Sequence, residues 1–296
     1  MTDKQEDNDL TPSQSEDHNQ KDEVEKNRDE EFEKDIKEST TRIGQPELDR
    51  VDEVVYRQAL RALNASGIKY AVGSSFARYA YTGIWRYTKD LDVFLKHEDL
   101  KDAFFYLEQA GFETEIEFEH WLAKARKGEH FVDLIFGTGH GQIAVDDASF
   151  EGSKPEEILG VPTQLMPLEW VLASAMFVAE RRRFDGAEVI HLIKYAWEDI
   201  DWQRILNRLG DNRELLLWHL ILFDFVYPGH SDYLPQELMV ALFDEARRRW
   251  TAQDKDEKSF RGTLIDPFAF TVDIEDLGYE DRRNTESLVD EEGEEL

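Results

Sequence analysis

The sequence predicts an α+β protein, with a sheet-containing region over residues 47–162 and a helical region over residues 163–251. Two observations carry this prediction. In the first region, short apolar runs with a period of two alternate with segments of helical spacing. From Pro167 onward the apolar residues keep a helical period without interruption by strand patterns. A third observation is the polar, acidic character of the two ends.

The two ends of the chain are acidic tails. Residues 1–46 hold 15 acids and 7 bases, and residues 252–296 hold 15 and 5, so that −12 of the total charge of −30 belongs to the middle. The first tail has too few apolar residues to offset the entropy of ordering, so we expect it to be disordered. The second tail is expected to be mostly disordered as well. Its apolar cluster, Pro267, Phe268 and Phe270, is expected to dock on the folded body.

The composition excludes several classes of protein and site. The chain has no cysteine, which rules out disulfides and thiolate metal sites. It has no apolar signal core and no run of about 18 apolar residues, so we expect no membrane anchor and a cytoplasmic protein. The middle of the chain is acidic, whereas phosphate backbones are bound by basic faces. A general nucleic-acid surface is therefore not expected.

The sheet-containing region divides into expected elements at glycines and polar turns. Helices are expected over residues 48–66, 76–81 and 98–110, and strands over 68–72, 90–95, 112–118 and 130–136, followed by a glycine-rich loop over 137–161. The strand at 112–118 alternates apolar and acidic residues and should be half-exposed. The strand at 130–136 is almost entirely apolar and should be buried in the centre of the sheet.

The helical region contains at least five expected helices. They cover residues 167–177, 187–197, 201–209, 214–226 and 235–250. Asp185 and Asp201 stand at positions where an aspartate can cap a helix N-terminus. We expect these helices to form a second domain that packs on the sheet domain.

Asp90 and Asp92 form the first candidate site. On a strand they project from one face, while Leu91 and Val93 project from the other. Aspartate is disfavoured in strands, and two adjacent carboxylates raise each other's pKa unless a cation lies between them. A magnesium ion, which takes oxygen ligands, is the obvious candidate. The plain alternative is a pair of exposed acids at the start of a strand.

The turn Gly73-Ser74-Ser75 is a candidate phosphate site, because it follows a strand and precedes a helix. Backbone N–H groups and the helix dipole favour an anion at such a turn. The alternative for Ser74 is an ordinary helix cap. Arg86 is a candidate for balancing the charge of a triphosphate, whereas strand parity directs Lys89 away from the acids. A phosphate site beside a metal site indicates chemistry on a nucleoside triphosphate.

The order Gly73-Ser74, helix, Asp90-x-Asp92 resembles the nucleotidyltransferases of the polymerase-beta-like superfamily. Within it, the chain is most similar to the small bacterial enzymes that modify antibiotics and to their uncharacterised relatives. The resemblance covers roughly residues 47–227. It implies a mixed β-sheet domain followed by helices. It also implies a third carboxylate on a later strand of the same sheet.

Asp133 is the candidate for this third carboxylate, as the only acid within an otherwise apolar strand. It shares a face of that strand with Phe131 and Ile135. A buried, unpaired carboxylate is costly, so we expect Asp133 to meet Asp90 and Asp92 at one site. By the same parity the histidine at position 130 points away and is structural.

The resemblance implies a reaction as well as a fold. Two Mg²⁺ ions would be held by Asp90, Asp92 and Asp133, and a nucleoside triphosphate, with ATP the first candidate, would donate its NMP to a hydroxyl group. The acceptor would be a small molecule or a protein, pyrophosphate would leave, and Asp133 would take the proton of the hydroxyl. The basic residues within 180–185 have two interpretations: nucleotide or acceptor binding, or a favourable interaction with the dipole at a helix C-terminus. The second interpretation is preferred.

A rival hypothesis keeps the fold but not the reaction. The domain would be a binding module, such as the antitoxin-like half of a two-protein system. The acidic tails and the tryptophans of the helical region would then contact a protein partner; these are Trp170, Trp197, Trp202 and Trp218. Retention of all three acids argues for the enzyme.

Overall fold

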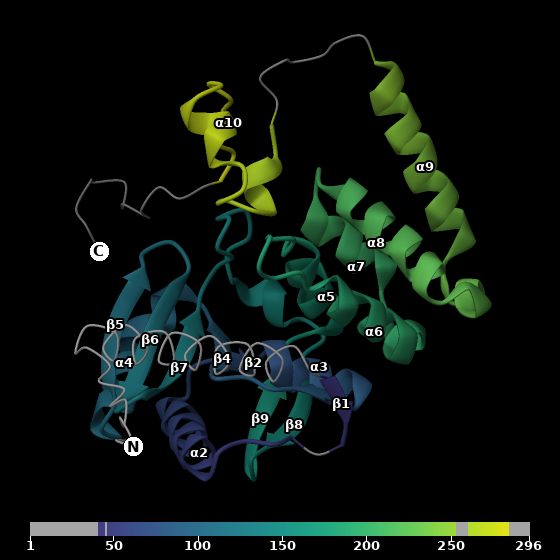
Figure 1. Ribbon diagram of the computed structural model, residues 1–296. Coiled ribbons are helices and arrows are strands. Elements are labelled where there is room, and N and C mark those ends of the chain that lie inside the picture. The colour runs from purple at the N-terminus through teal and green to yellow at the C-terminus, as the bar shows by residue number, and fades with distance from the viewer. Residues whose placement is uncertain (1–40, 45, 253–259, 284–296) are drawn as a thin grey trace, which may run out of the picture.

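A computed structural model describes residues 41–44, 46–252 and 260–283 (Figure 1). The expectation of disorder in residues 1–40 and 284–296 lies outside the described residues. Residues 41–43 were assigned to the first tail by their composition. In the structure they form the short strand β1 (Thr41–Ile43). This strand pairs antiparallel with β3 (Ile84–Arg86) in a small separate sheet.

The main sheet has seven strands in the order β5-β6-β7-β4-β2-β9-β8. Their bounds are β2 Tyr70–Val72, β4 Leu91–Leu95, β5 Glu113–Phe118, β6 Leu122–Lys127, β7 His130–Ile135, β8 Lys154–Ile158 and β9 Val161–Leu165. The pairs β4–β7 and β2–β9 are parallel and the others are antiparallel. The predicted α+β fold with a mixed sheet is therefore confirmed.

Strands β8 and β9 are a correction. β8 lies within residues 137–161, which were expected to form a loop, and β9 runs from the end of that loop into residues 163–165, which were assigned to the helical region. The first of them, β8, contains a proline and mostly exposed polar residues. It lies at the edge of the sheet, where one row of its backbone groups needs no partner strand and proline is tolerated. Edge strands without an apolar face give no clear strand pattern in a sequence.

Helices α2 (Arg50–Ser66) and α4 (Leu100–Gln109) pack against one another and against the sheet (Figure 1). Asp49 caps α2 by accepting a hydrogen bond from the N–H of Val51, and Gly67 ends it with a φ of 74°. That left-handed conformation favours glycine. The buried side chains of α2, such as Tyr56 and Leu60, therefore join the core of the sheet.

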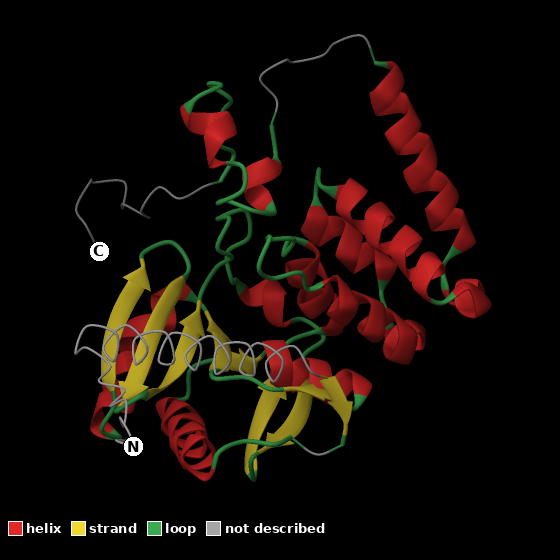
Figure 2. Ribbon diagram, viewed as in Figure 1, coloured by secondary structure: helices red, strands yellow, loops and turns green. Residues whose placement is uncertain are grey.

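The remaining helices follow the sheet in the sequence, except for α3 (Ser74–Thr82), which follows β2. They are α5 Leu168–Met176, α6 Gly186–Ala196, α7 Trp202–Leu209, α8 Arg213–Val226 and α9 Gln236–Thr251. Short 3₁₀ turns occur at His97–Asp99, Asp147–Phe150, Trp197–Asp199, Pro228–Tyr233 and Gly262–Leu264. Figure 2 shows the strands on one side of the molecule and these helices on the other. Helix α3 contacts both α5 and α6 and so connects the two groups.

The five helices expected between residues 167 and 251 are all present. Asp201 caps α7 as expected, accepting from the N–H groups of Gln203 and Arg204. Asp185 stands at the start of α6, but its side chain does not cap the helix and contacts arginines instead. The division of the chain into two domains stays a prediction.

Residues 260–283 form a compact segment with a short helix, α10 (Thr271–Glu275). Leu264 is buried against the body, whereas Phe268, expected to dock, is 82% exposed. Within the described part of the chain, no helix combines the length and the apolar character needed to cross a lipid bilayer.

Candidate active site

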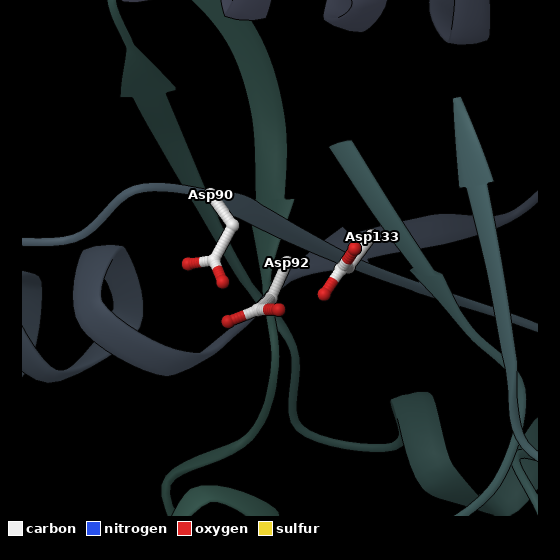
Figure 3. A group of neighbouring side chains, drawn as sticks. All are labelled: Asp90, Asp92 and Asp133. Atoms are coloured by element: carbon white, nitrogen blue, oxygen red, sulfur yellow. The ribbon is translucent and has the colours of Figure 1, made fainter. Parts of the chain in front are cut away.

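Asp90, Asp92 and Asp133 meet at one place on the sheet, with one carboxylate oxygen of each within 4.8 Å of the others (Figure 3). The strand register produces this meeting. β4 and β7 run parallel as neighbours, and Asp92 is paired directly with Asp133. Asp90 precedes β4 by one residue, and its Oδ1 accepts a hydrogen bond of 2.5 Å from the hydroxyl of Thr88. We call these three residues the acid site.

The acid site lies on the face of the sheet opposite helix α2. Along β7, His130, Val132 and Leu134 point to one face, and the Nδ1 of His130 lies 2.6 Å from a carboxylate oxygen of Asp52 in α2. Asp133 projects from the other face. The predicted parity of this strand, including a structural role for His130, therefore agrees with the structure.

The acid site carries more negative charge than its surroundings balance. Burial raises the pKa of Asp92 to about 7, and the charges of Asp90 and Asp133 add to this, although hydrogen bonding from Ser74 works in the opposite direction. Burial likewise raises the pKa of Asp133 to about 6, while the ammonium of Lys124 lowers it. Carboxylates held together in this way favour a bound proton or a bound cation.

Lys124 is the cation nearest to Asp133, and sequence reasoning missed it. No strand was expected between residues 118 and 130, but Lys124 lies on β6, where it is paired with Asp133. Its Nζ lies 3.3 Å from Asp133 Oδ1 and 3.3 Å from Glu117 Oε2. That buried oxygen of Asp133 nevertheless has no well-aligned hydrogen-bond donor among the described residues.

The turn at Gly73 and Ser74 lies directly beside the acid site. The N–H of Gly73 donates to the carbonyl of Asp92 at 3.0 Å. A Cβ at Gly73 would lie 2.2 Å from the ring of Phe94, so only glycine fits. Ser74 has a φ of 43°, a left-handed conformation that is costly for serine and is often found at functional sites. Gly73, not Ser74, occupies the cap position of α3.

Ser75, on α3, and Arg86, on β3, are the other predicted nucleotide ligands, and both line a small pocket together with residues of α6. Ser75 is buried, and Arg78 and Glu188 line the same pocket. Arg86 donates to Glu188 and lies 3.7 Å from Asp185. The positive charge of Arg86 is thus already paired within the protein.

Arg78, Arg86, Asp185 and Glu188 form what we call the interface cluster. Arg78 is buried, with its two amino groups 3.3 Å from Glu188 and 3.8 Å from Asp185. Burial alone would raise the pKa of Asp185, but a bidentate bond from Arg183 and the charges of Arg78 and Arg86 hold it below its ordinary value. The cluster joins α3 and β3 to the start of α6.

Arg183 connects the two groups of charges, and sequence reasoning did not single it out. The preferred interpretation placed residues 180–185 at a helix C-terminus, but α5 ends at Met176. Arg183 instead lies in the connection to α6, where its Nε and Nη2 donate to Asp185 at 3.1 and 2.9 Å. Its side chain is 53% exposed. Burial would lower the pKa of Arg183, but the hydrogen bonds and charge of Asp185, with smaller contributions from the charges of Asp92 and Asp90, raise it.

No protein-family model matches the chain, and no curated protein matches its sequence. Among solved structures, the protein is similar to the antibiotic-resistance factor ANT(2'')-Ia, with 13% sequence identity, a TM-score of 0.41, and coverage of 56% of this chain and 94% of that chain. It is also similar to the lincosamide antibiotic adenylyltransferase LnuA, with 14% identity, a TM-score of 0.33, and coverage of 47% and 94%.

A third similar structure is a putative nucleotidyltransferase from Thermotoga maritima, with 13% identity, a TM-score of 0.34, and coverage of 42% of this chain and 82% of that chain. Likenesses of this size decide nothing about activity, which has to rest on the residues of this chain.

Proposed function

We propose that the protein is a metal-dependent nucleotidyltransferase that transfers an NMP from a nucleoside triphosphate to a hydroxyl acceptor and releases pyrophosphate. One observation carries the proposal: three carboxylates converge within 4.8 Å beside a strand–Gly73–Ser74–helix turn. The first feature suits a divalent cation, and the second suits the phosphates that such a cation accompanies.

The residues of the acid site fit Mg²⁺. All three offer carboxylate oxygens, the donors that this ion prefers, and Asp133 keeps an oxygen without a hydrogen-bond donor among the described residues. Burial first, and then the charge of Asp90, raises the pKa of Asp92 to about 7, so that a bound cation would favour its ionised form. When bound, divalent cations would neutralise charge on the triphosphate and acidify the acceptor hydroxyl.

The triphosphate would lie between the turn at Gly73 and the side chain of Arg183. The first backbone N–H groups of α3 and the hydroxyl of Ser74 are donors on one side. Arg183 supplies a guanidinium on the other, and its pair with Asp185 uses only two of its five N–H donors. Arg183 would thus take the role first considered for Arg86.

Asp133 would be the general base. A base must lie within hydrogen-bond reach of the proton that it accepts, and Asp133 is the member of the acid site farthest toward the β6 side of the sheet. Its raised pKa of about 6 is suited to accepting a proton near neutral pH. The acceptor, a small molecule or a protein side chain, would approach over that side.

Calorimetric titration of the four nucleoside triphosphates, with and without Mg²⁺, tests this proposal. We expect metal-dependent binding of one nucleotide by the wild type and its loss in Asp92→Asn, which removes charge from the acid site at constant shape. Asp52→Asn is a suitable control, because Asp52 is a buried aspartate on the opposite face of the sheet. If the wild type binds no nucleotide with Mg²⁺ present, the protein is not a nucleotidyltransferase.

A further inference from the structure

The connection between α5 and α6 is a hairpin, which we call the arginine hairpin (residues 178–185). The N–H of Asp185 donates to the carbonyl of Val178 at 3.1 Å, and Ala179 and Phe184 form an antiparallel bridge. The hairpin therefore has a defined shape at its base. Its second strand carries Arg183, whose guanidinium donates to Asp185 at the start of α6.

The first strand of this hairpin is bonded to a distant part of the sequence. In residues 260–283, the carbonyl of Ile265 accepts a hydrogen bond of 3.2 Å from the N–H of Ala179, and Asp266 Oδ2 accepts one of 2.9 Å from the N–H of Arg181. This segment is drawn in yellow above the sheet in Figure 1. The hairpin is thus fixed by Asp185 on the side of the body and by Asp266 on the outer side.

Asp266 is a buried carboxylate whose contacts suit this role. Its side chain is 4% exposed, and its Oδ1 accepts from the N–H groups of Phe268 and Ala269 at 3.0 and 2.8 Å. Those two bonds shape the local turn. The Oδ2 bond to Arg181, 85 residues away in the sequence, has no part in that turn and instead connects two regions of the chain.

The same segment also reaches the sheet region. Gln142, in the loop that follows β7, donates from its side-chain amide to the carbonyl of Arg282 at 2.6 Å. Since β7 carries Asp133, residues 260–283 contact both the arginine hairpin and the loop behind the proposed general base. The segment is therefore placed to fix the hairpin relative to the acid site.

We infer that Asp266 is a positioning residue for Arg183. By binding the N–H of Arg181, it fixes the arginine hairpin so that the guanidinium of Arg183 faces the acid site and meets the triphosphate. The inference rests on the proposed function. It assigns to residues 260–283 a part in nucleotide binding, although they lie far from the acidic residues in the sequence and contribute no ligand themselves.

Asp266→Asn tests this inference, because it exchanges one acceptor oxygen for a donor at nearly constant shape. We expect affinity for Mg-ATP to fall about tenfold, the size of one hydrogen bond to a charged group. In the Arg183→Met background the same change should have no further effect, since Asp266 acts through Arg183. Hydrogen exchange of the peptide that contains residues 178–185 should become faster in Asp266→Asn.

Asp281→Asn is the matched control. Asp281 belongs to the same segment and is bonded to Thr263 and Arg283, not to the hairpin. It should leave both nucleotide affinity and hairpin exchange unchanged. Wild-type affinity in Asp266→Asn, or an equal loss with and without Arg183, would overturn the inference.

A second variant keeps the test valid if Asp266→Asn does not fold. In Asp266→Ser the shorter hydroxyl can still cap the turn at Phe268 and Ala269 but does not reach Arg181, so the same tenfold loss is expected. Failure of the proposed function is recognised separately, because the wild type itself would then bind no Mg-ATP. In that case the inference falls with it.

Discussion

The acid site and the interface cluster are neighbouring groups of charges that shift the pKa of a buried aspartate in opposite directions. In the acid site, the pKa of Asp92 is raised to about 7, first by burial and then by the charge of Asp90. In the interface cluster, Asp185 is more deeply buried, yet contacts with Arg183, Arg78 and Arg86 hold its pKa below its ordinary value. Burial acts on both residues in the same direction, so the cations make the difference.

This difference separates a structural from a functional arrangement of charge. The interface cluster pairs each carboxylate with guanidinium groups inside the protein, and a ligand would gain little there. The acid site brings three carboxylates together against Lys124 and Arg183, with part of that positive charge already shared with Glu117 and Asp185. Its remaining negative charge is what a metal ion would neutralise.

The largest expected effect comes from removing a charge of the acid site. Asp133→Asn should reduce nucleotidyl transfer by about 1000-fold or more, because metal ligation supplies several kcal/mol to a transition state and each 1.4 kcal/mol is tenfold. The melting temperature should stay the same or rise, since a buried like charge is lost. Steady-state pyrophosphate release and thermal unfolding measure the two quantities.

Glu117→Gln is the matched control for Asp133→Asn. Both carboxylates lie 3.3 Å from Lys124, but Glu117 is outside the acid site. It should keep activity within a factor of about three, because a partly exposed ion pair contributes less than about 1 kcal/mol. Equal losses in both variants would show that the effect runs through Lys124 and not through a metal.

In the interface cluster, in contrast to the acid site, removing a carboxylate charge should lower stability. Asp185→Asn leaves three guanidinium groups around an uncharged side chain and should lower the free energy of unfolding by about 3–5 kcal/mol. Denaturant unfolding measures the change. Asp199→Asn, which breaks an exposed pair with Lys154, should cost less than about 1 kcal/mol. A stable Asp185→Asn protein would contradict a structural role for the cluster.

The pH dependence of stability provides a smaller test. The pKa values of Asp92 and Asp133 in the folded protein, about 7 and about 6, lie above the ordinary value of 3.8, so the folded state binds more protons than the unfolded state between about pH 4 and 7. The stability that this provides is fully present below pH 4 and is lost as pH rises through 7.

Thermal unfolding from pH 4 to 8 in a metal chelator tests this dependence. Relative to the wild type, Asp92→Asn should lose much of the decline toward pH 7. Added Mg²⁺ should restore stability at the upper end of the range, since a ligand that binds only the folded state stabilises it. A wild type that becomes more stable than the variant as pH rises would refute the raised pKa.

The smallest effect is expected from removing the positive charge of Lys124 beside the acid site. Lys124→Met removes the charge that lowers the pKa of Asp133, so this pKa should rise by about one unit. Mn²⁺ binding followed against pH should shift its midpoint upward accordingly. An unchanged midpoint would indicate that Lys124 is electrostatically separate from the acid site.

Much of the fold followed from local sequence patterns, because those patterns report local preferences. The apolar period, the glycine at the end of α2 and the aspartate that caps α7 depend on a few neighbouring residues. The alternation within β7 likewise fixed which face Asp133 occupies. Strand β8, at one edge of the sheet, was missed, since Lys154–Ile158 has no apolar face to mark it.

The sequence by itself determined the kinds of chemical groups: two acids on one strand, a third acid on another, and a Gly-Ser turn before a helix. The meeting of the three acids was expected from the family resemblance, and tertiary structure decided how they meet and which cations lie beside them. The parallel register of β4 and β7 sets Asp92 against Asp133, and β6 adds Lys124. Arg183 reaches Asp185 from a hairpin whose first strand is bonded to the distant Asp266. Strand pairing and helix packing bring together residues that are far apart in the chain, and a local sequence pattern does not identify those partners.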